Sequence, residues 1–356
     1  MKCSKCNSLV SQRLQTDNFN NETNDFHTLY DKDYWFSYQE KELKLPNILS
    51  RARTDLTDRC IYWLDTFLKY KLPPAKTLEL GSAHGGFVAM LNWANFDATG
   101  LEISPWVVDF SSKTFSVPIL LGVVEEQDIK PESLDAIILM DVFEHLADPA
   151  RTMRHCLSLL KQNGILLIQM PCLPENISYE QMVENNDTFL SILKDVGHLY
   201  LFSKKSIREF FYRIGAKYLE FEPPIFSHYD MFFVVSREPL EVNAIEEIEK
   251  SLSETPSGRL VQALLDIYKQ RNVLREKYEG TEANRAAGLE VINRVSNELS
   301  TKEAAIKQLH KTLLQSECNL KIKCDELETI RSSFIWRIIK SFRWIYNRFI
   351  PGSNTQ

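Results

Sequence analysis

Short apolar runs alternate with helical patterns between residues 75 and 238. The runs lie at 77–80, 98–101, 118–121, 136–140 and 165–170. Because they are largely continuous instead of alternating with polar residues, they predict strands of a parallel sheet covered on both faces. Two further runs, at 218–221 and 231–235, predict a closing antiparallel hairpin around Pro223 and Pro224. The pattern is typical of a doubly wound α/β domain.

Helices are expected over 87–91, 148–161 and 204–214. Asn163-Gly164 is the expected stop signal for the helix over 148–161, and Gly215 for the helix over 204–214. Before this domain the chain is polar and aromatic, and a helical pattern ends ahead of Pro73-Pro74. We expect this first part to form a cap outside the core. After Pro239 the texture changes to long helix. The expected divisions are therefore 1–72, 73–240, 241–330 and 331–356.

One heptad register runs from 260 to 330. Its a positions are Leu264, Arg271, Tyr278, Arg285, Ile292, Leu299, Ile306, Leu313, Leu320 and Leu327, and its d positions are Leu260, Ile267, Leu274, Thr281, Gly288, Val295, Lys302, Leu309, Ser316, Lys323 and Ile330. Of these 21 sites 14 are apolar, which favours a coiled coil. The register is weakest near Gly280, where a break would instead give a helical hairpin that folds back on the domain.

The residues from 333 to 350 predict an amphipathic helix. Its apolar arc holds Phe334, Ile335, Ile338, Ile339, Phe342, Ile345, Tyr346 and Phe349, while Arg337, Lys340, Arg343, Asn347 and Arg348 fill the other arc, with Trp336 and Trp344 towards the polar side. Such a helix is suited to a membrane interface. The alternative is that the apolar arc packs on the protein's own helices or on a partner.

Charge is divided unevenly along the chain. The net charge is −6, but residues 331–356 carry five basic and no acidic side chains, which leaves −11 on the first 330 residues. An acidic body is unsuited to tracking a phosphate backbone, so we expect no nucleic-acid partner. Seven scattered cysteines, no secretory signal and no long apolar stretch predict a cytoplasmic protein, and the basic tail favours the inner face of the cytoplasmic membrane.

The segment from Leu78 to Gly86 carries the most specific chemistry. An apolar strand that contains Glu79 runs into a glycine-rich turn that opens a helix, so backbone N–H groups face a polar or anionic ligand. Glu102 ends the next strand about 20 residues later, where a carboxylate accepts the hydroxyls of a ribose. The spacing does not match the Gly-x-Gly-x-x-Gly of dinucleotide-binding proteins.

This turn resembles the Glu-x-Gly-x-Gly-x-Gly first motif of class I S-adenosylmethionine-dependent methyltransferases, with Ala83 in place of the middle glycine. The segments 122–126, 133–138, 140–149 and 197–203 resemble later motifs of a bacterial branch found in surface-polysaccharide and O-antigen gene clusters. The matching segments lie between residues 75 and 238 and follow one another in the order of the family's motifs. It implies a Rossmann-like, seven-stranded methyltransferase sheet, mostly parallel with a closing antiparallel hairpin, that binds S-adenosylmethionine.

The resemblance also implies which residues bind the cofactor. They are Glu79, Gly81, Ser82, Gly85, Glu102, Ile103, Val124 and Asp141. The turn would hold the methionine part and Glu79 would orient the turn. Glu102 would bind the ribose, and Ile103 with residues 123–125 the adenine.

An alcohol acceptor needs its proton removed, by a base or by a metal that lowers its pKa. His145 is the candidate base, with Glu144 beside it, because both follow the fourth strand at the ligand-binding edge of the sheet. A structural histidine is the alternative. Asp141, Glu144, His145 and the distant His198 resemble the divalent-cation site of ribose O-methyltransferases that act on RNA ends, although relatives carry the same run without a metal.

The acceptor is inferred from the C-terminal part. Residues 332–343 resemble the tail of bacterial enzymes that build surface polysaccharides, and a methyltransferase domain followed by a coiled coil resembles chain-terminating modifiers of O-antigen. These resemblances imply O-methylation of a sugar hydroxyl in a surface glycan or in its lipid-linked or nucleotide-sugar precursor. They also imply self-association, or a glycosyltransferase partner, through 260–330.

Three alternatives remain open: methylation of quinone-like or other small molecules, methylation of RNA ribose, and a non-enzymatic coiled-coil scaffold with a relic cofactor fold. At the N-terminus, Cys3 and Cys6 form half of a zinc ribbon whose second Cys-x-x-Cys pair is missing, so we expect a vestigial ribbon without zinc.

Overall fold

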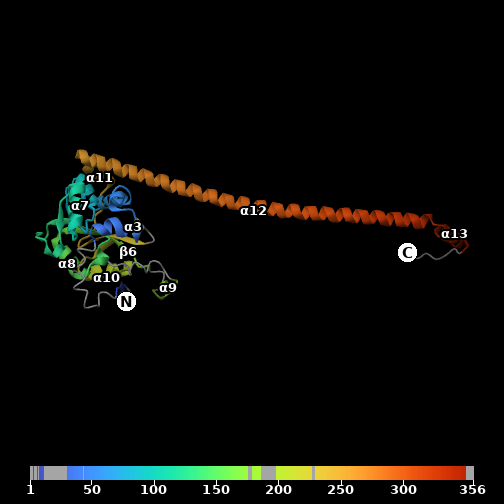
Figure 1. Ribbon diagram of the computed structural model, residues 1–356, viewed down its shortest axis with the longest axis horizontal. Helices are drawn as coiled ribbons and strands as arrows, with labels where there is room; N and C mark the ends of the chain where they lie inside the picture. Colours follow the sequence, from blue (N-terminus) through green and yellow to red (C-terminus); the bar gives the residue numbers. More distant parts are fainter. Residues whose placement is uncertain are drawn as a thin grey trace. The chain divides into compact units, whose positions relative to one another are not determined.

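The computed structural model describes residues 3, 6, 8–11, 30–42, 44–174, 179–185, 198–226 and 229–349, and of residues 179, 283 and 344–349 it describes the backbone alone. The chain divides into two compact units, Met1–Arg271 and Asn272–Gln356. The first unit contains the sheets and the shorter helices (Figure 1). The second is helical over its described residues except at Ser333.

A seven-stranded sheet forms the centre of the first unit, in the order β4-β3-β2-β5-β6-β9-β8. The strands are β2 (Lys76–Leu80), β3 (Asp97–Glu102), β4 (Ile119–Leu121), β5 (Leu134–Met140), β6 (Leu160–Pro171), β8 (Tyr218–Glu222) and β9 (Asp230–Ser236). Strands β2 to β6 pair in parallel, and the β8–β9 hairpin joins β6 in antiparallel fashion. The predicted fold class is confirmed. A separate two-stranded sheet is formed by β1 (Leu9–Val10), which pairs in antiparallel fashion with β7 (Tyr200–Leu201).

Helices cover both faces of this sheet. They are α5 (Asp55–Leu68), α6 (Gly86–Trp93), α7 (Pro105–Phe115), α8 (Pro149–Leu159), α10 (Lys204–Arg213) and α11 (Ile245–Ser253), with the shorter η3 (Tyr34–Tyr38), α3 (Gln39–Lys41), α4 (Ile48–Arg51), η4 (Val124–Glu126), η5 (Phe143–His145) and α9 (Tyr179–Glu184). On β5, Ala136 and Ile138 pack with α5 and α6, while Ile137 and Leu139 pack with α8 and α10. Burial on both faces explains why the strand is apolar at successive positions.

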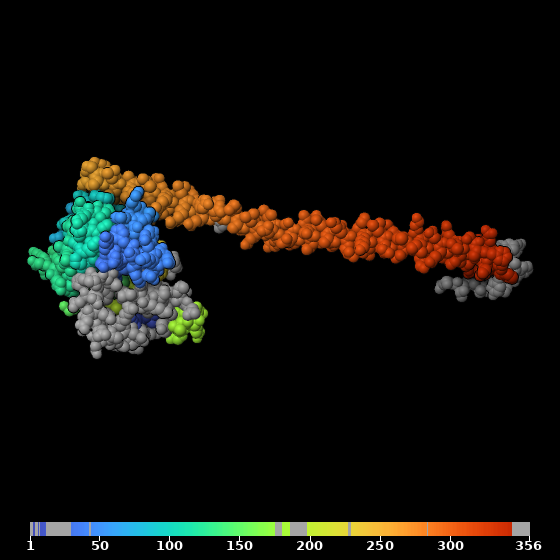
Figure 2. All heavy atoms as spheres, viewed as in Figure 1, coloured from blue at the N-terminus to red at the C-terminus, as the bar shows by residue number. Residues whose placement is uncertain are grey.

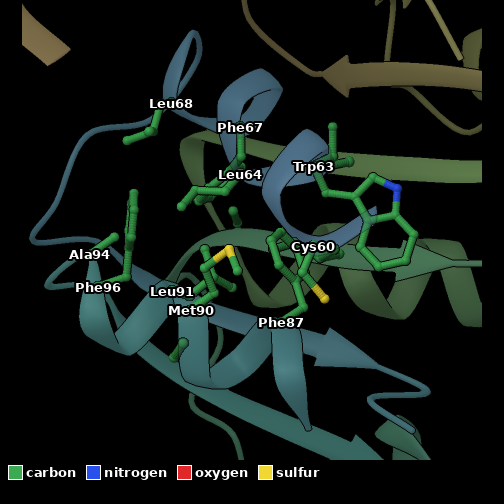
Figure 3. Packing of buried hydrophobic residues seen from close by; sticks show 14 of the residues in the cluster. Cys60, Trp63, Leu64, Phe67, Leu68, Phe87, Met90, Leu91, Ala94 and Phe96 are labelled. Carbon is green, nitrogen blue, oxygen red and sulfur yellow. The ribbon is translucent and has the colours of Figure 1, made fainter. Parts of the chain in front are cut away.

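Helix α5 belongs to the core, which differs from the expectation that residues 1–72 form a cap. Cys60, Trp63, Leu64 and Phe67 are buried and gather against the labelled side chains of α6 in Figure 3. The ring centroids of Phe67 and Phe96 lie 5.1 Å apart. The spacing of these apolar residues, at i, i+3, i+4 and i+7, is that of a helix with one buried face. The polar and aromatic texture of the preceding residues obscured it.

The junction of α8 and β6 also differs from expectation. Helix α8 ends at Leu159 and β6 begins at the next residue, so Asn163 and Gly164 lie inside the strand and are not a helix stop. Leu134 pairs with Leu160, but the next pair is Ala136 with Ile165. The four residues from 161 to 164 therefore form a bulge in β6. Gly164 is required there, because a Cβ would lie 2.9 Å from the Cβ of Leu160.

Helix α12 (Pro256–Ser332) begins in the first unit. Val261 and Leu265, both 4% exposed, pack on the cluster that contains α5 and α6. The predicted d positions Leu260 and Ile267 remain 74% and 62% exposed. The a-position Leu264 packs on the same cluster, so the first turns of α12 contact the domain through an a position and leave these d positions exposed.

In the second unit α12 continues without interruption through Gly280 and Gly288, so the predicted alternative of a break at Gly280 does not occur. From residue 284 to 332 every side chain is exposed (Figure 2, orange to red). Helix α13 (Phe334–Phe349) follows directly. The Ser333 hydroxyl accepts a hydrogen bond from the Trp336 N–H at 3.3 Å and caps it. Among the described helices none combines the length and hydrophobicity that crossing a membrane requires.

Replacing Phe67 by alanine tests the assignment of α5 to the core. Phe67 is fully buried, so we expect Phe67→Ala to destabilise the domain by about 3–5 kcal/mol. Thermal unfolding followed by circular dichroism measures the effect. The matched control is Tyr212→Ala, at an aromatic side chain that is 61% exposed, where we expect a change within about 0.5 kcal/mol. Equal effects of the two substitutions would contradict the assignment.

Candidate functional site

A cavity of about 1420 Å³ opens at the carboxyl ends of the parallel strands. It is lined by residues at the ends of β2, β3, β4 and β5 and at the start of β9. Residues between 30 and 63 form the rest of its lining. Sites for one small molecule usually measure about 300–1,000 Å³. The cavity therefore has room for a cofactor together with a second molecule. The edge of the sheet is the one where doubly wound domains bind ligands.

The turn after β2 depends on its glycines. Gly81 has φ +66°, and a Cβ there would lie 2.5 Å from Val142 Cγ2. Gly85 has φ +80°, and a Cβ would meet the Cβ of Ser111 at 2.9 Å. Both positions thus require glycine for conformation and for space. Ala83, where the methyltransferase motif has glycine, also adopts a left-handed φ of 44°. The turn therefore places three residues at left-handed φ, of which Ala83 is the one that carries a side chain and bears strain.

Glu102 ties this turn to the end of β3. Its Oε2 accepts the N–H of Ala83 at 3.1 Å, and its Oε1 accepts the N–H groups of Ile103 and Ser104 at 2.8 and 3.1 Å. Burial raises its pKa, which these three donors oppose. A carboxylate has about four lone-pair sites, so about one remains, on Oε2. Glu102 was expected to accept ribose hydroxyls, and its remaining capacity fits one of them.

Two buried polar atoms at the end of β2 and in the turn after it have no hydrogen-bond partner among the described residues: Oε2 of Glu79 and Oγ of Ser82. Both residues line the cavity and are less than 5% exposed. Burial raises the pKa of Glu79, and the nearby Glu102 raises it further. Unsatisfied buried groups of this kind are costly without a ligand. They fit the ammonium and carboxylate of the methionine part of S-adenosylmethionine.

The predicted adenine-binding residues also line the cavity. Ile103 follows Glu102, and Val124, 3% exposed, begins η4 beyond Gly122. The Val124 carbonyl lies 3.2 Å from His155 Nε2, which fixes the segment against α8. Apolar side chains at this point suit the face of a purine ring.

A second group of residues follows β5. Glu144 is fully buried, and neither of its carboxylate oxygens has a hydrogen-bond partner among the described residues. Its Oε1 lies 4.0 Å from His145 Nε2 and 3.8 Å from His198 Nε2, and the two imidazole centroids are 4.6 Å apart. Burial raises the pKa of Glu144 well above its usual range, and the neighbouring Asp141 adds to the rise. Three residues predicted from the sequence thus come together.

These three residues fit a divalent cation. One ligand atom from each of Glu144, His145 and His198 lies within 4.8 Å of the others. Two imidazoles and a carboxylate suit ions of the Mn, Fe or Zn class. Asp141, the fourth predicted ligand, is not in the group. It lines the same cavity, but its Oδ2 lies 3.4 Å from Arg59 Nη1 and its Oδ1 accepts Gln169 Nε2 at 3.2 Å.

Two charged side chains that line this cavity, Arg59 and Asp230, are not predicted from the sequence. Arg59 lies on α5, 5.0 Å above the ring of Phe226, and reaches Asp141. Asp230 begins β9 and pairs with Pro171 at the carboxyl end of β6. It is 5% exposed, and its Oδ1 has no hydrogen-bond partner among the described residues. Burial, and then Asp141, raise its pKa to about 8, against the opposing charge of Arg59.

A signal for Asp230 was present in the sequence. An antiparallel strand begins at the edge where its parallel neighbour ends, so a polar residue just before the run 231–235 was a site candidate. The sequence holds no such signal for Arg59, because its pattern predicts residues 1–72 as a cap outside the core. His84 was also overlooked. It is 5% exposed, and burial, followed by the charge of Arg51, lowers its pKa to about 4, so it stays neutral beside Phe115.

The aromatic residues ahead of α5 border the cavity. Tyr30 and Tyr34 line it with their ring centroids 5.0 Å apart, and the Tyr30 ring lies edge-on to His145 at 6.5 Å. Cys3 and Cys6 are not part of any group that could hold a metal within the part of the chain that the structure describes. Gly197, in the last predicted motif, lies outside the described residues.

Residues 52–220 match the family model described as a methyltransferase domain. This part of the chain is a methyltransferase domain of the S-adenosylmethionine-dependent class. The methyltransferase domain contains β2 to β6, the glycine turn, Glu102 and the Glu144 group. The predicted methyltransferase class and its cofactor are confirmed, and the surface-polysaccharide branch stays a prediction.

Curated relatives of this methyltransferase domain include the ubiquinone biosynthesis O-methyltransferases of three strains of Xanthomonas campestris pv. campestris. Each is 30% identical over 103 residues, covering 27% of this chain and 43% of the relative. The chain thus spans less than half the length of the curated relatives it matches.

Similar solved structures include a methyltransferase from Thermotoga maritima, with a TM-score of 0.39, 18% identity, and coverage of 54% of this chain and 96% of that one. Magnesium protoporphyrin IX methyltransferase from Synechocystis PCC 6803, solved with bound SAH, has a TM-score of 0.39 and 17% identity over 58% of this chain and 98% of that chain.

Ala83 provides a test of the turn. Left-handed conformation costs a non-glycine residue about 1–2 kcal/mol, and glycine returns part of that in chain entropy. We therefore expect Ala83→Gly to stabilise the domain by about 0.5–1 kcal/mol, measured by thermal unfolding. In the control Ala150→Gly, in the first turn of α8, glycine should instead lower stability. A loss of stability in Ala83→Gly would show that the strained turn is misassigned.

Proposed function

We propose that this protein transfers a methyl group from S-adenosylmethionine to a sugar hydroxyl of a bacterial surface glycan, or of its lipid-linked or nucleotide-sugar precursor. The observation that carries the proposal is the division of the cavity between two kinds of residue. Cofactor-binding residues follow β2, β3 and β4, and acid and base groups follow β5 and begin β9. The cavity is also larger than one ligand needs.

Bound S-adenosylmethionine supplies an electrophilic methyl group on a cationic sulfur. The chain's own contribution on this side is binding and orientation. The N–H groups of the turn and the acceptor atoms of Glu79 and Glu102 fix the two polar ends of the cofactor, and Ile103 and Val124 cover its base. Holding both reactants in line accounts for most of the catalysis such a transfer needs.

The acceptor side favours a molecule rich in hydroxyl groups. Glu144 and Asp230 both have buried carboxylate oxygens without partners, and such oxygens accept hydrogen bonds from hydroxyls. Tyr30, Tyr34 and Phe226 line the same cavity with aromatic rings. Carboxylates interleaved with aromatic rings suit a sugar, which has hydroxyl edges and apolar faces.

The acceptor oxygen forms a bond to the methyl carbon as the carbon–sulfur bond breaks, and the hydroxyl proton must go to a base. His145 is the first candidate because it borders the cavity beside Glu144. Asp230 is the second candidate, because it lines the same cavity and its Oδ1 has no hydrogen-bond partner among the described residues. The alternative to His145 as a base is a divalent cation held by Glu144, His145 and His198, which would occupy the His145 nitrogen and supply a Lewis acid that lowers the pKa of a bound hydroxyl, with Asp230 as the base.

A second candidate function is methylation of a phenolic hydroxyl on a quinone-like small molecule. The similarity to ubiquinone biosynthesis O-methyltransferases supports it. It requires the same base and the same cofactor geometry, but it assigns no role to the exposed apolar positions of α12. Methylation of RNA ribose is less suited to the charge of −11 on the first 330 residues.

The exposed heptad positions support a proposed role for 260–330 in self-association or in binding a glycosyltransferase. Six successive a positions from Ile292 to Leu327 are aliphatic and 56–66% exposed. A coiled coil would bury them. Together with the proposed acceptor, this favours a cytoplasmic protein that works beside the membrane.

The acceptor class is tested by incubating the full chain with methyl-labelled S-adenosylmethionine and three acceptor pools: lipid-linked glycans with nucleotide sugars from the host, quinone precursors, and RNA. We expect label in the sugar pool, recovered as a methyl ether after hydrolysis. Label in the quinone precursors alone would support the second candidate function. Label in none of the pools would contradict both.

The base is tested with His145→Ala and Asp230→Asn. Removing a general base lowers kcat by about 10²–10⁴-fold, and affinity for S-adenosylmethionine should stay unchanged, because neither side chain is among the proposed cofactor ligands. Single-turnover rates with a methyl-accepting sugar measure the effect. The matched control His310→Ala changes an exposed histidine of α12 and should keep full activity. Unchanged rates in both site variants would exclude them from proton removal.

A further inference from the structure

Helix α13 presents two chemically different faces. In a helix with about 100° per residue, its apolar side chains from 334 to 342 share an arc of about 140°. They are Phe334, Ile335, Ile338, Ile339 and Phe342, with exposures of 77%, 69%, 37%, 51% and 67%. Arg337, Lys340 and Arg343 lie outside that arc, and they too are exposed. Nothing within the described part of the second unit covers the apolar face.

The charge of this helix has one sign. Residues 331–356 include no acidic side chain, although α12 just before them carries Asp325, Glu326 and Glu328. If the apolar face packed only on another helix, the excess of basic side chains in this segment would have no role. A second copy of α13 would bring the basic side chains of both helices together, which opposes association. The charge is instead complementary to an anionic surface.

We infer that α13 is an interfacial helix that binds the surface of a bilayer containing anionic lipids. Its apolar face enters the boundary between headgroups and acyl chains, and Arg337, Lys340 and Arg343 contact the anionic headgroups. Trp336 lies beside the basic residues and is 41% exposed, and indole rings are enriched at this depth of a membrane. The helix lies on the membrane and does not cross it.

The inference is independent of the proposed acceptor, since it uses residues of the second unit alone. It adds a location to the chemistry. An enzyme that modifies a lipid-linked molecule gains from being held on the surface that holds its substrate, because both partners are then confined to one layer.

Flotation of the full chain with vesicles tests the inference. With phosphatidylcholine vesicles that contain phosphatidylglycerol, we expect the chain to float, and with pure phosphatidylcholine we expect much weaker flotation. Raising the salt concentration should reduce binding to the anionic vesicles. Replacing Arg337 or Lys340 by glutamine should weaken it by about fivefold for each charge removed, as expected from about 1 kcal/mol for each basic residue near the surface.

The apolar face is tested with Ile335→Asp, which should reduce flotation at least tenfold. The matched control is Ile322→Asp, an exposed isoleucine of α12 that lies outside the a and d positions and should leave flotation unchanged. Both sites are exposed, so thermal unfolding of the first unit should match the unchanged chain in either variant. Equal flotation of Ile335→Asp and the unchanged chain would overturn the inference, as would self-association that is lost in Ile335→Asp without any binding to vesicles.

Discussion

Burial of the central strands on both faces is the constraint on which the rest of this structure depends. Strands β5 and β6 are covered by α5 and α6 on one side and by α8 and α10 on the other, and their covered segments 136–140 and 165–168 contain no polar side chain. Polar groups are therefore displaced to the strand ends. Parallel strands all end at the same edge, and the antiparallel β9 begins there. The fold thus gathers side chains from distant parts of the sequence into one cavity.

The chemistry of that edge follows from buried carboxyl groups that have no hydrogen-bond partner among the described residues. Glu79, Glu144 and Asp230 are buried carboxyls with oxygens that no described residue satisfies, and their pKa values are all raised by burial. A stable protein bears such a cost where a ligand offsets it. Glu102 is the contrast, because its carboxylate already accepts hydrogen bonds from three backbone N–H groups and ties the turn to the end of β3. Binding groups and structural groups can thus be told apart by their hydrogen bonds.

The sequence predicted the strands and the edge residues because both follow from local patterns. Continuous apolar runs mark buried strands, and the residues after them, such as Glu102 and Glu144, must lie at the edge. Arg59 could not be placed in this way, since it reaches Asp141 only through the packing of α5 on the sheet. The bulge at 161–164 was hidden because Asn163-Gly164 is equally typical of a helix end. The packing of Val261 and Leu265 likewise depends on a tertiary contact that competes with the heptad pattern.

The central claim is that the edge cavity binds S-adenosylmethionine through the turn after β2 and Glu102. Calorimetric titration of the full chain with S-adenosylmethionine tests it most directly. The account predicts one saturable site per chain and an affinity that falls by about 10–100-fold in Glu102→Gln, the loss expected for a hydrogen bond to a charged group. The absence of binding to the unchanged chain, or an affinity unaffected by Glu102→Gln, would contradict it.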